Sequence, residues 1–308
     1  MKKAFLLLML LAFFDRGWAQ LAKDSTVSIN GQVVTLSEVV IDTRLNVASF
    51  IKRVQEDTSF YKAFKNLRVL GFSAINDIKM LNSKGNVQAS LHSKTQQRVQ
   101  HGCRTMETKE STHTGDLYDH GHWNYYTPQL YASLFFTKDT ICGETNIVAH
   151  SSFSTQGKSG MDKHKEQLKM LFFNPGKKIS GIPFLSNKTE LFDPTVSQHY
   201  DMTIDLDEYK QTSCYVFKQV VKPGHENNVA IDAMTTWFND STFEVVARNY
   251  SLSYDAGVYD FKVSMEVEMT RFKDLLVPSL IRYNGNWKAI FKKRERGVFT
   301  ATLFDFEN

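Results

Sequence analysis

Cysteine and proline are scarce in this sequence, and the common catalytic motifs are missing from it. Only three cysteines and six prolines occur in 308 residues. There is no Cys-x-x-Cys pair and no phosphate-binding loop, and the stretch after His225 lacks the second histidine of a zinc-protease helix. Residues 71–75 lack the last glycine of a hydrolase nucleophile elbow. We therefore expect no cofactor and no enzymatic activity.

A strong net charge is absent as well. The formal net charge is +4 at pH 7, which gives no field suited to nucleic acid. Residues 4–14 form an apolar run that follows Lys2 and Lys3 and precedes Gly17 and Ala19, the small residues of a cleavage site. Because a membrane-spanning helix needs about 20 apolar residues, we predict that residues 1–19 are a signal peptide rather than an anchor. We expect a soluble, exported protein of the periplasm or the extracellular space.

Export places the three cysteines in an oxidising compartment, where one disulfide is expected. Cys214 lies in an apolar strand pattern and is expected to be a small buried residue. Cys103 and Cys142 both lie in polar, turn-rich segments, so they are the favoured pair. Three free thiols are the alternative.

Aromatic residues are plentiful, with 23 Phe and 12 Tyr, and residues 259–270 carry the clearest pattern. Apolar and polar residues alternate there, and because side chains alternate between the faces of a strand, one face is apolar and the other solvated. The apolar set is Tyr259, Phe261, Val263, Met265, Val267 and Met269. Similar runs over residues 200–306 predict an antiparallel meander, with turns at residues 239–240, 255–257 and 284–286.

The segments before this meander predict a mixture of strands and helices. Residues 27–36 read as a hairpin through Asn30-Gly31, followed by a strand-like run over 38–41. Apolar residues recur at helical spacing over 46–67. Strands are expected over 68–104 with a turn at 82–86, then a loop over 105–123, a helix over 125–136 with Pro128 in its first turn, and an amphipathic helix over 161–173.

These elements predict an α+β fold, in which a strongly curved antiparallel sheet, an incomplete β-barrel, is covered by a few helices. The expected division is a signal peptide at 1–19, an N-terminal hairpin extension at 20–45 and a single domain at 46–308. That domain carries a loop and helix insertion over about 105–195.

One histidine-bearing segment could bind a metal ion. His120 and His122 are close to Asp116 and Asp119, and two imidazoles with a carboxylate can share a divalent ion. No third ligand is identifiable, although other histidines could converge on the pair: His101, His113 and His150. A solvated loop is the favoured interpretation, and a metal-dependent hydrolase using His120 and His122 is the alternative.

The apolar face of the meander has two interpretations. It is either an ordinary filled core or the lining of a pocket for acyl chains, formed where a curved sheet is covered by helices. The candidate ligand-binding residues are Trp237, Tyr259, Phe261, Val263, Met265, Val267 and Met269 from the sheet, with Leu168, Leu171 and Phe172 from the preceding helix.

Part of the meander resembles a known superfamily. The run Thr236-Trp237-Phe238-Asn239, the strands over 245–254 and 259–269, and Val277-Pro278 resemble the periplasmic lipoprotein carriers of the LolA and LolB type. Asn239 stands where that family has an acidic residue, and this chain is longer than a typical carrier.

The resemblance implies an incomplete barrel closed by helices, with a hydrophobic cavity for acyl chains. The expected function is an exported cell-envelope protein that binds or carries a lipid or a lipid-modified protein, with an outer-membrane partner. A non-enzymatic envelope interaction or structural protein with a filled core is the other alternative.

Overall fold

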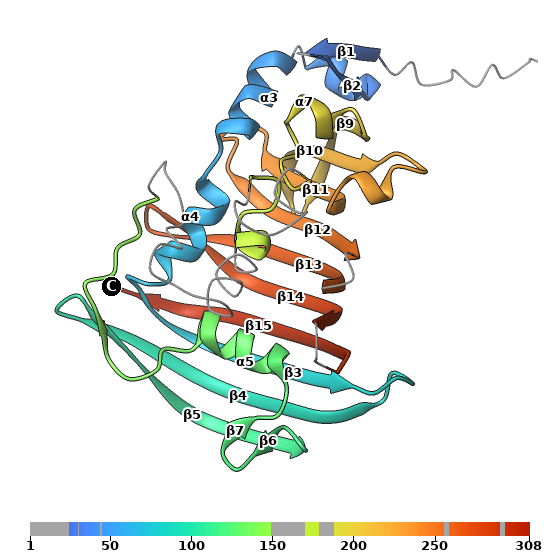
Figure 1. Cartoon of the computed structure of the whole chain (residues 1–308). Coiled ribbons are helices and arrows are strands. Elements are labelled where there is room, and N and C mark those ends of the chain that lie inside the picture. Colours follow the sequence, from blue (N-terminus) through green and yellow to red (C-terminus); the bar gives the residue numbers. More distant parts are fainter. Residues whose placement is uncertain are drawn as a thin grey trace, which may run out of the picture.

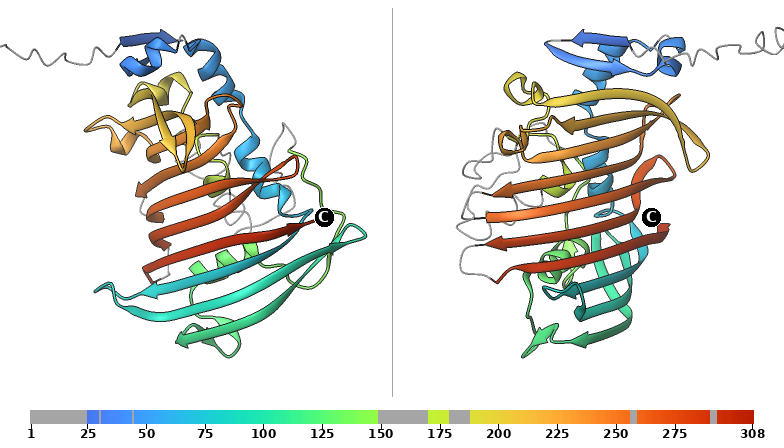
Figure 2. Two further views of the ribbon diagram at one scale, coloured as in Figure 1. Left: turned by 180° about the vertical axis from the view of Figure 1, so that it is seen from behind. Right: turned by 90° about the vertical axis from the view of Figure 1, so that its right-hand side faces the viewer.

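A single large sheet dominates the computed structural model, which describes residues 25–29, 31–43, 45–148, 170–178, 188–255, 259–289 and 293–308. The sheet has thirteen strands in the order β1-β2-β9-β10-β11-β12-β13-β14-β15-β3-β4-β5-β8. Only β2 and β9 pair in parallel within it. The sheet is curved but not closed into a barrel, and α3, α4 and α5 lie against one face (Figures 1 and 2). The predicted α+β class with a curved antiparallel sheet is confirmed.

The bounds of the elements show a strand-rich chain with short helices. The strands are β1 (Ser25–Ile29), β2 (Gln32–Leu36), β3 (Gly71–Leu81), β4 (Val87–Gln100), β5 (Cys103–Gly115), β6 (Tyr118–Asp119), β7 (His122–Trp123), β8 (Ile141–Cys142), β9 (Tyr200–Tyr209), β10 (Thr212–Val221), β11 (Ile231–Asn239), β12 (Val245–Asp255), β13 (Tyr259–Phe272), β14 (Leu275–Ala289) and β15 (Glu295–Glu307). The helices are α2 (Glu38–Asp42), α3 (Val47–Glu56), α4 (Ser59–Asn66), α5 (Tyr126–Phe135), α7 (Pro194–Ser197) and the 3₁₀ turn η1 (Glu226–Asn228).

The alternation in residues 259–270 produces the predicted one-sided burial. Phe261, Val263, Met265 and Val267 are buried, whereas the residues between them, Lys262, Ser264 and Glu266, are exposed. Burying each apolar side chain stabilises the fold by about 1.5–3 kcal/mol. The buried face of β13 therefore belongs to the core of the protein.

The helical spacing over 46–67 forms α3 and α4. Asn46 caps α3, because its Oδ1 accepts a hydrogen bond from the Ser49 amide at 3.0 Å. Asp57 separates the two helices, and its Oδ1 accepts the Ser59 amide at 3.0 Å. Phe50 of α3 meets the sheet edge-to-face at centroid distances of 5.9 Å to Phe217 and 5.5 Å to Phe238. The predicted helical layer is confirmed.

The strand-like run predicted over 38–41 is wrong, because these residues form α2. The amide of Ser37 donates to Ile204 O at 3.1 Å. The amides of Val40 and Ile41 donate to Ser37 O, which begins the helix. Val40 is buried, while Val39 and Ile41 are exposed. Tertiary packing of one valine overrides the strand preference of this β-branched run.

The loop predicted over 105–123 is also wrong in its first half, which forms the long strand β5. Its residues from Glu107 to Gly115 are exposed on both faces, so no apolar alternation marks the strand in the sequence. Apart from a short pairing of β8 with Cys103 and Arg104, β5 pairs only with β4 in the described part of the chain. Charges at Glu107, Lys109 and Glu110 suit such an edge strand, because they oppose pairing with another chain.

The turn predicted at 284–286 is wrong, because β14 continues through it. Asn284 pairs with Val298 and Gly285 pairs with Gly297. A Cβ on Gly285 would lie 1.9 Å from Tyr283 Oη, so glycine is needed here for the Tyr283 ring and not for a turn. That ring stacks on Phe299 with centroids 4.7 Å apart. The strand β14 continues beyond the expected turn to Ala289.

Some of the remaining predictions are confirmed, and others concern residues that the structure does not describe. The hairpin turn at 82–86 and the helix α5 are confirmed. Residues 170–173 are helical, as expected. The predicted signal peptide, Asn30, His150, Leu168, the rest of the helix over 161–169, and residues 256, 257 and 290–292 lie outside the described residues.

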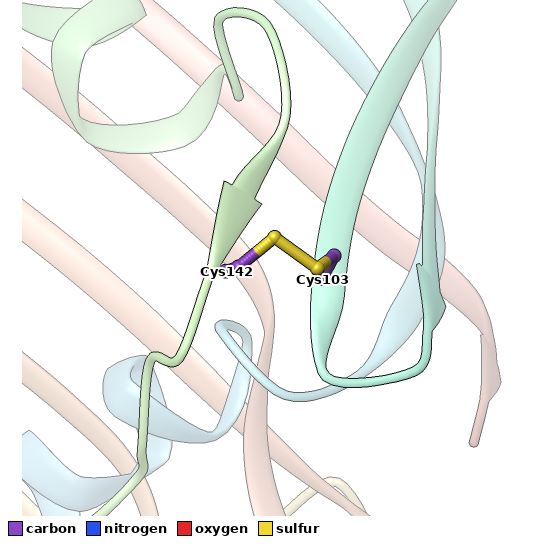
Figure 3. Close-up of a disulfide and its surroundings, with 2 residues drawn as sticks. All are labelled: Cys103 and Cys142. Carbon is purple, nitrogen blue, oxygen red and sulfur yellow. A yellow bond between two sulfur atoms is a disulfide. The ribbon is translucent and has the colours of Figure 1, made fainter.

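A disulfide joins Cys103 of β5 to Cys142 of β8, the pair that the sequence favoured (Figure 3). Beside it, Arg104 forms an ion pair with Glu144 at 2.5 Å and donates to Gln97 Oε1 at 3.2 Å. Cys214 is a buried free thiol. Burial raises the pKa of Cys214 to about 11, so it remains protonated and a weak nucleophile.

We expect Ellman's reagent to find no reactive thiol in the native protein and one thiol after unfolding without reductant, because Cys214 is buried. Cys103→Ser lowers the free energy of unfolding by about 3 to 4 kcal/mol in the chain-entropy view, measured by urea denaturation. Cys214→Ala is the control that leaves the disulfide intact. Two or three thiols in the unreduced, unfolded protein would contradict the pairing.

We also expect Gly285→Ala to lower the free energy of unfolding by about 1–3 kcal/mol, because the new methyl group overpacks the stacked Tyr283 ring. Asn284→Ala is the neighbouring control on the exposed side of β14. Urea denaturation measures both. The same unfolding free energy for Gly285→Ala and the wild type would show that the ring moves freely.

Candidate functional site

The inner face of the sheet, defined here as the face that packs against α3, α4 and α5, carries the candidate site. Strand register aligns Tyr250, Met265, Tyr283 and Phe299 in one row across β12, β13, β14 and β15. All four side chains are buried. The row places three aromatic rings and a methionine side by side, and the α5 rings of Tyr131 and Phe135 pack on Phe299 at its end.

An apolar pocket, called the aromatic slot below, lies between α5 and this row. Its lining is almost wholly aromatic and aliphatic: Thr127, Leu130, Tyr131, Leu134, Phe135, Phe172, Phe173, Met265, Tyr283, Trp287 and Phe299. Its cavity volume is about 20 Å³, which is room for about one or two water molecules. Five residues of the lining are only partly buried: Leu130, Leu134, Phe135, Phe173 and Trp287.

Buried tyrosines around the slot act as neutral hydrogen-bond donors. Burial raises the pKa of Tyr131, Tyr250 and Tyr283 far above the ordinary tyrosine value. Tyr131 donates to Asn76 Oδ1 at 2.5 Å, and Tyr250 donates to the carbonyl of Phe172. The phenols of Tyr131 and Tyr250 are thus occupied, and the slot lining consists mainly of aromatic rings and aliphatic side chains.

Helix α5 is held over the slot by a carboxylate from the sheet. Its N-cap residue, Tyr125, makes no side-chain cap. Glu295 of β15 accepts the amides of Tyr126 and Thr127 at 2.7 and 2.8 Å and the Thr127 hydroxyl at 2.8 Å. The carboxylate satisfies two free amides at the positive end of the helix. Trp287 Nε1 also donates to Thr127 Oγ1 at 2.9 Å, so one end of α5 is fixed to β14 and β15.

Arg248 brings a charge onto the same inner face. Its side chain is buried, its Nε donates to Thr236 Oγ1 at 2.9 Å, and its guanidinium lies 4.3 Å from the centroid of the Phe60 ring. Among the described residues, no carboxylate lies within ion-pair distance of it. Burial lowers the pKa of Arg248, and the negative charge of Asp57 acts in the opposite direction.

The structure brings some of the candidate ligand-binding residues together and separates others. Met265 and Phe172 line the aromatic slot. Phe261, Val263, Val267 and Leu171 are buried, whereas Met269 is only partly buried. For Tyr259 only the backbone is described, and Leu168 lies outside the described residues.

Trp237 lies on the opposite, outer face. It pairs with Ala247, whereas the neighbouring Thr236 pairs with Arg248 on the inner face. Its ring contacts Tyr209 at a centroid distance of 5.1 Å. The residue is therefore not part of the aromatic slot, because the parity of β11 turns it away from α5.

Sequence reasoning missed most of the slot lining, namely the α5 side chains with Tyr283, Trp287 and Phe299. A signal was present for two of them. Phe299 alternates with Ala301 and Leu303 along β15, and Tyr283 alternates with Ile281 along β14. The pairing of α5 with these strands is a long-range contact that no local pattern encodes.

The histidine-bearing segment does not assemble a metal centre. Asp119 pairs with His122 in the small β6–β7 hairpin, and His120 sits in its turn with φ 47°. The His120 side chain is 92% exposed, with Nδ1 at 2.6 Å from Asp119 Oδ1. Within the described ranges, no group of three or more His, Cys, Asp or Glu residues could hold a metal ion.

Comparisons with known proteins give distant similarities. A DUF1329 family protein from Desulfovibrio piger ATCC 29098 is 12% identical, with a TM-score of 0.25 and coverage of 81% of this chain and 93% of that chain. An outer membrane lipoprotein-sorting protein domain from Vibrio parahaemolyticus is 9% identical, with a TM-score of 0.25 and coverage of 79% and 88%. No protein-family model and no curated protein matches the chain. No helix in the described ranges is long and apolar enough to cross a membrane.

We expect Glu295→Ala to loosen α5 from the sheet. The change removes the acceptor of two helix amides and should lower the free energy of unfolding by about 1–2 kcal/mol. Hydrogen exchange should show faster exchange of the amides of Tyr126 and Thr127. Glu266→Ala is the matched control, since that exposed carboxylate only pairs with Arg282 at 3.1 Å on the outer face. Unchanged exchange at both amides would contradict the anchoring role.

Proposed function

We propose that this protein binds an acyl chain, or a ligand of similar hydrophobic character, between α5 and the inner face of the sheet. The aromatic slot is the observation that carries the proposal. Its lining offers many apolar contacts and few polar groups, which suits a ligand recognised by dispersion and burial rather than by hydrogen bonds. Methionine at position 265 adds an adaptable surface, because its thioether chain fits irregular ligands.

The partly buried residues of the slot support the same function. Leu130, Leu134, Phe135 and Phe173 each leave part of an apolar side chain in contact with water. Apolar side chains at the rim of an apolar pocket are surface that a hydrophobic ligand can cover. A ligand that inserts beside α5 would cover this surface while its chain contacts the rings beneath.

Entry of an acyl chain requires α5 to move, since the slot of about 20 Å³ is nearly closed. Glu295 and Trp287 hold the start of the helix. Beyond its end, the buried Thr137 hydroxyl donates to Gln97 Oε1 at 2.7 Å. The half-buried side chains of Leu134 and Phe135 in the last turn are therefore the part that would rearrange when a ligand enters.

The role that fits such a site is that of an envelope protein which binds or carries a lipid or the acyl chain of a lipid-modified protein. It rests on the slot, the expected secretory signal and the resemblance to periplasmic lipoprotein carriers. The small volume of the slot favours a second candidate, an envelope interaction protein whose core is filled and which recognises its partner without lipid.

Two variants separate these functions. We expect the wild type to enhance the fluorescence of the neutral probe N-phenyl-1-naphthylamine and to carry lipid detectable by native mass spectrometry. Leu134→Trp fills the slot and should weaken probe binding by tenfold or more. Ser251→Trp adds the same bulk on the outer face and should bind like the wild type, with equal melting temperatures as the folding check. A wild type that binds neither probe nor lipid favours the filled-core protein.

A further inference from the structure

Arg248 is an unpaired charge in an apolar layer, and its surroundings do not neutralise it. A guanidinium has five N–H donors, yet the one hydrogen bond that Arg248 donates goes to Thr236 Oγ1 at 2.9 Å. Phe60 covers the guanidinium with its ring face, which is a weak partner compared with a carboxylate. Buried charges in proteins are normally paired, because leaving one alone costs several kcal/mol.

The other charges near Arg248 do not supply an ion pair within the described residues. Lys177, whose Nζ donates to the carbonyl of Gln55, is partly buried and is influenced by the charges of Arg248, Asp57, Glu190 and Glu56. Asp57 is the carboxylate whose charge acts on Arg248. It is partly buried, and its Oδ1 is occupied by the Ser59 amide at 3.0 Å. The N-terminus of α4 at Ser59 adds a partial positive charge to the same place.

A second unpaired polar group lies on the inner face. Gln219 is fully buried, and neither its Nε2 nor its Oε1 has a hydrogen-bond partner among the residues that the structure describes. Register places it in the row of Met234 and Tyr250, which continues into the slot at Met265. An apolar layer with an unpaired amide and an unpaired guanidinium lacks the polar groups that would satisfy them.

The distance from Arg248 to the aromatic slot suits one amphiphilic ligand. Arg248 precedes Tyr250 by two positions on β12, and Tyr250 pairs with Met265 of the slot. Strand spacings put the backbones of Arg248 and Met265 about 8 Å apart. A chain of several carbons covers that separation.

We propose that Arg248 receives the anionic head group of the ligand, a carboxylate or a phosphate, while the acyl chain lies in the aromatic slot. This inference rests on the proposed function and assigns the chemical class of its ligand, an anionic amphiphile. A carboxylate or phosphate can accept two parallel N–H bonds from a guanidinium. The pairing would satisfy donors that the protein alone leaves unused.

The decisive experiment compares ligands that differ only in the head group. Displacement of N-phenyl-1-naphthylamine is measured with laurate, dodecyl phosphate and dodecanol on wild type, Arg248→Met and Arg53→Met. Arg53 is the matched control, because its guanidinium also covers a ring, that of Phe243 at 4.6 Å, but is exposed to solvent.

For the wild type we expect laurate or dodecyl phosphate to bind at least tenfold more tightly than dodecanol. Whichever anion binds more tightly identifies the head group as carboxylate or phosphate. Arg248→Met should abolish this preference and leave dodecanol affinity within about threefold of the wild type, because methionine keeps the apolar volume. Arg248→Lys should keep part of the preference, and Arg53→Met should keep all of it.

The results distinguish this inference from the proposed function. Equal affinity of the wild type for the anions and dodecanol overturns the role of Arg248 while the slot remains a binding site. Retention of the full preference in Arg248→Met overturns it as well. Failure of all three ligands and of the probe to bind the wild type overturns both. The comparison in the wild type requires no variant, so a misfolded Arg248→Met leaves the test intact.

Discussion

The two-residue period of β12 to β15 is the constraint on which the rest of this structure depends. It sends Tyr250, Met265, Tyr283 and Phe299 to one side of the sheet and charged residues such as Lys262 and Glu266 to the other. A slip of one residue in any pairing would reverse both faces of that strand. The helices α3, α4 and α5 then have one apolar surface on which to pack.

The sequence predicted correctly those elements whose buried residues recur at regular spacing or whose turn has a local signal. The alternation in β13, the helical spacing of α3 and α4 and the Asn82–Asn86 turn are all local signals. It failed where the decisive contact is distant or where no face is buried. β5 is polar on both sides and so resembles a loop, and Gly285 reads as a turn residue although the Tyr283 ring requires it. The slot lining needed the docking of α5 on β15, and Glu295 lies 169 positions from the amide of Tyr126.

The inner face contains side chains that stabilise the fold and others that destabilise it. Aromatic contacts such as Tyr283 with Phe299 stabilise the fold by removing rings from water. Gln219 does the reverse, because both polar atoms of its side chain are buried without a hydrogen-bond partner among the described residues. Arg248 also lowers stability, because its charge is taken out of water without a carboxylate at ion-pair distance in the described part of the chain. A layer built for stability alone would carry aliphatic residues at both positions.

The disulfide has a consequence for the mobility of α5. Cys103 and Cys142 are 39 positions apart, and the helix lies inside the covalent ring that they close. The helix cannot swing out on a long, slack tether, because both flanks of the ring return to β5. While the bond is intact, any displacement of the helix is limited by this ring. Cleavage of the sulfur–sulfur bond would remove the covalent restraint and lengthen the tether of the helix.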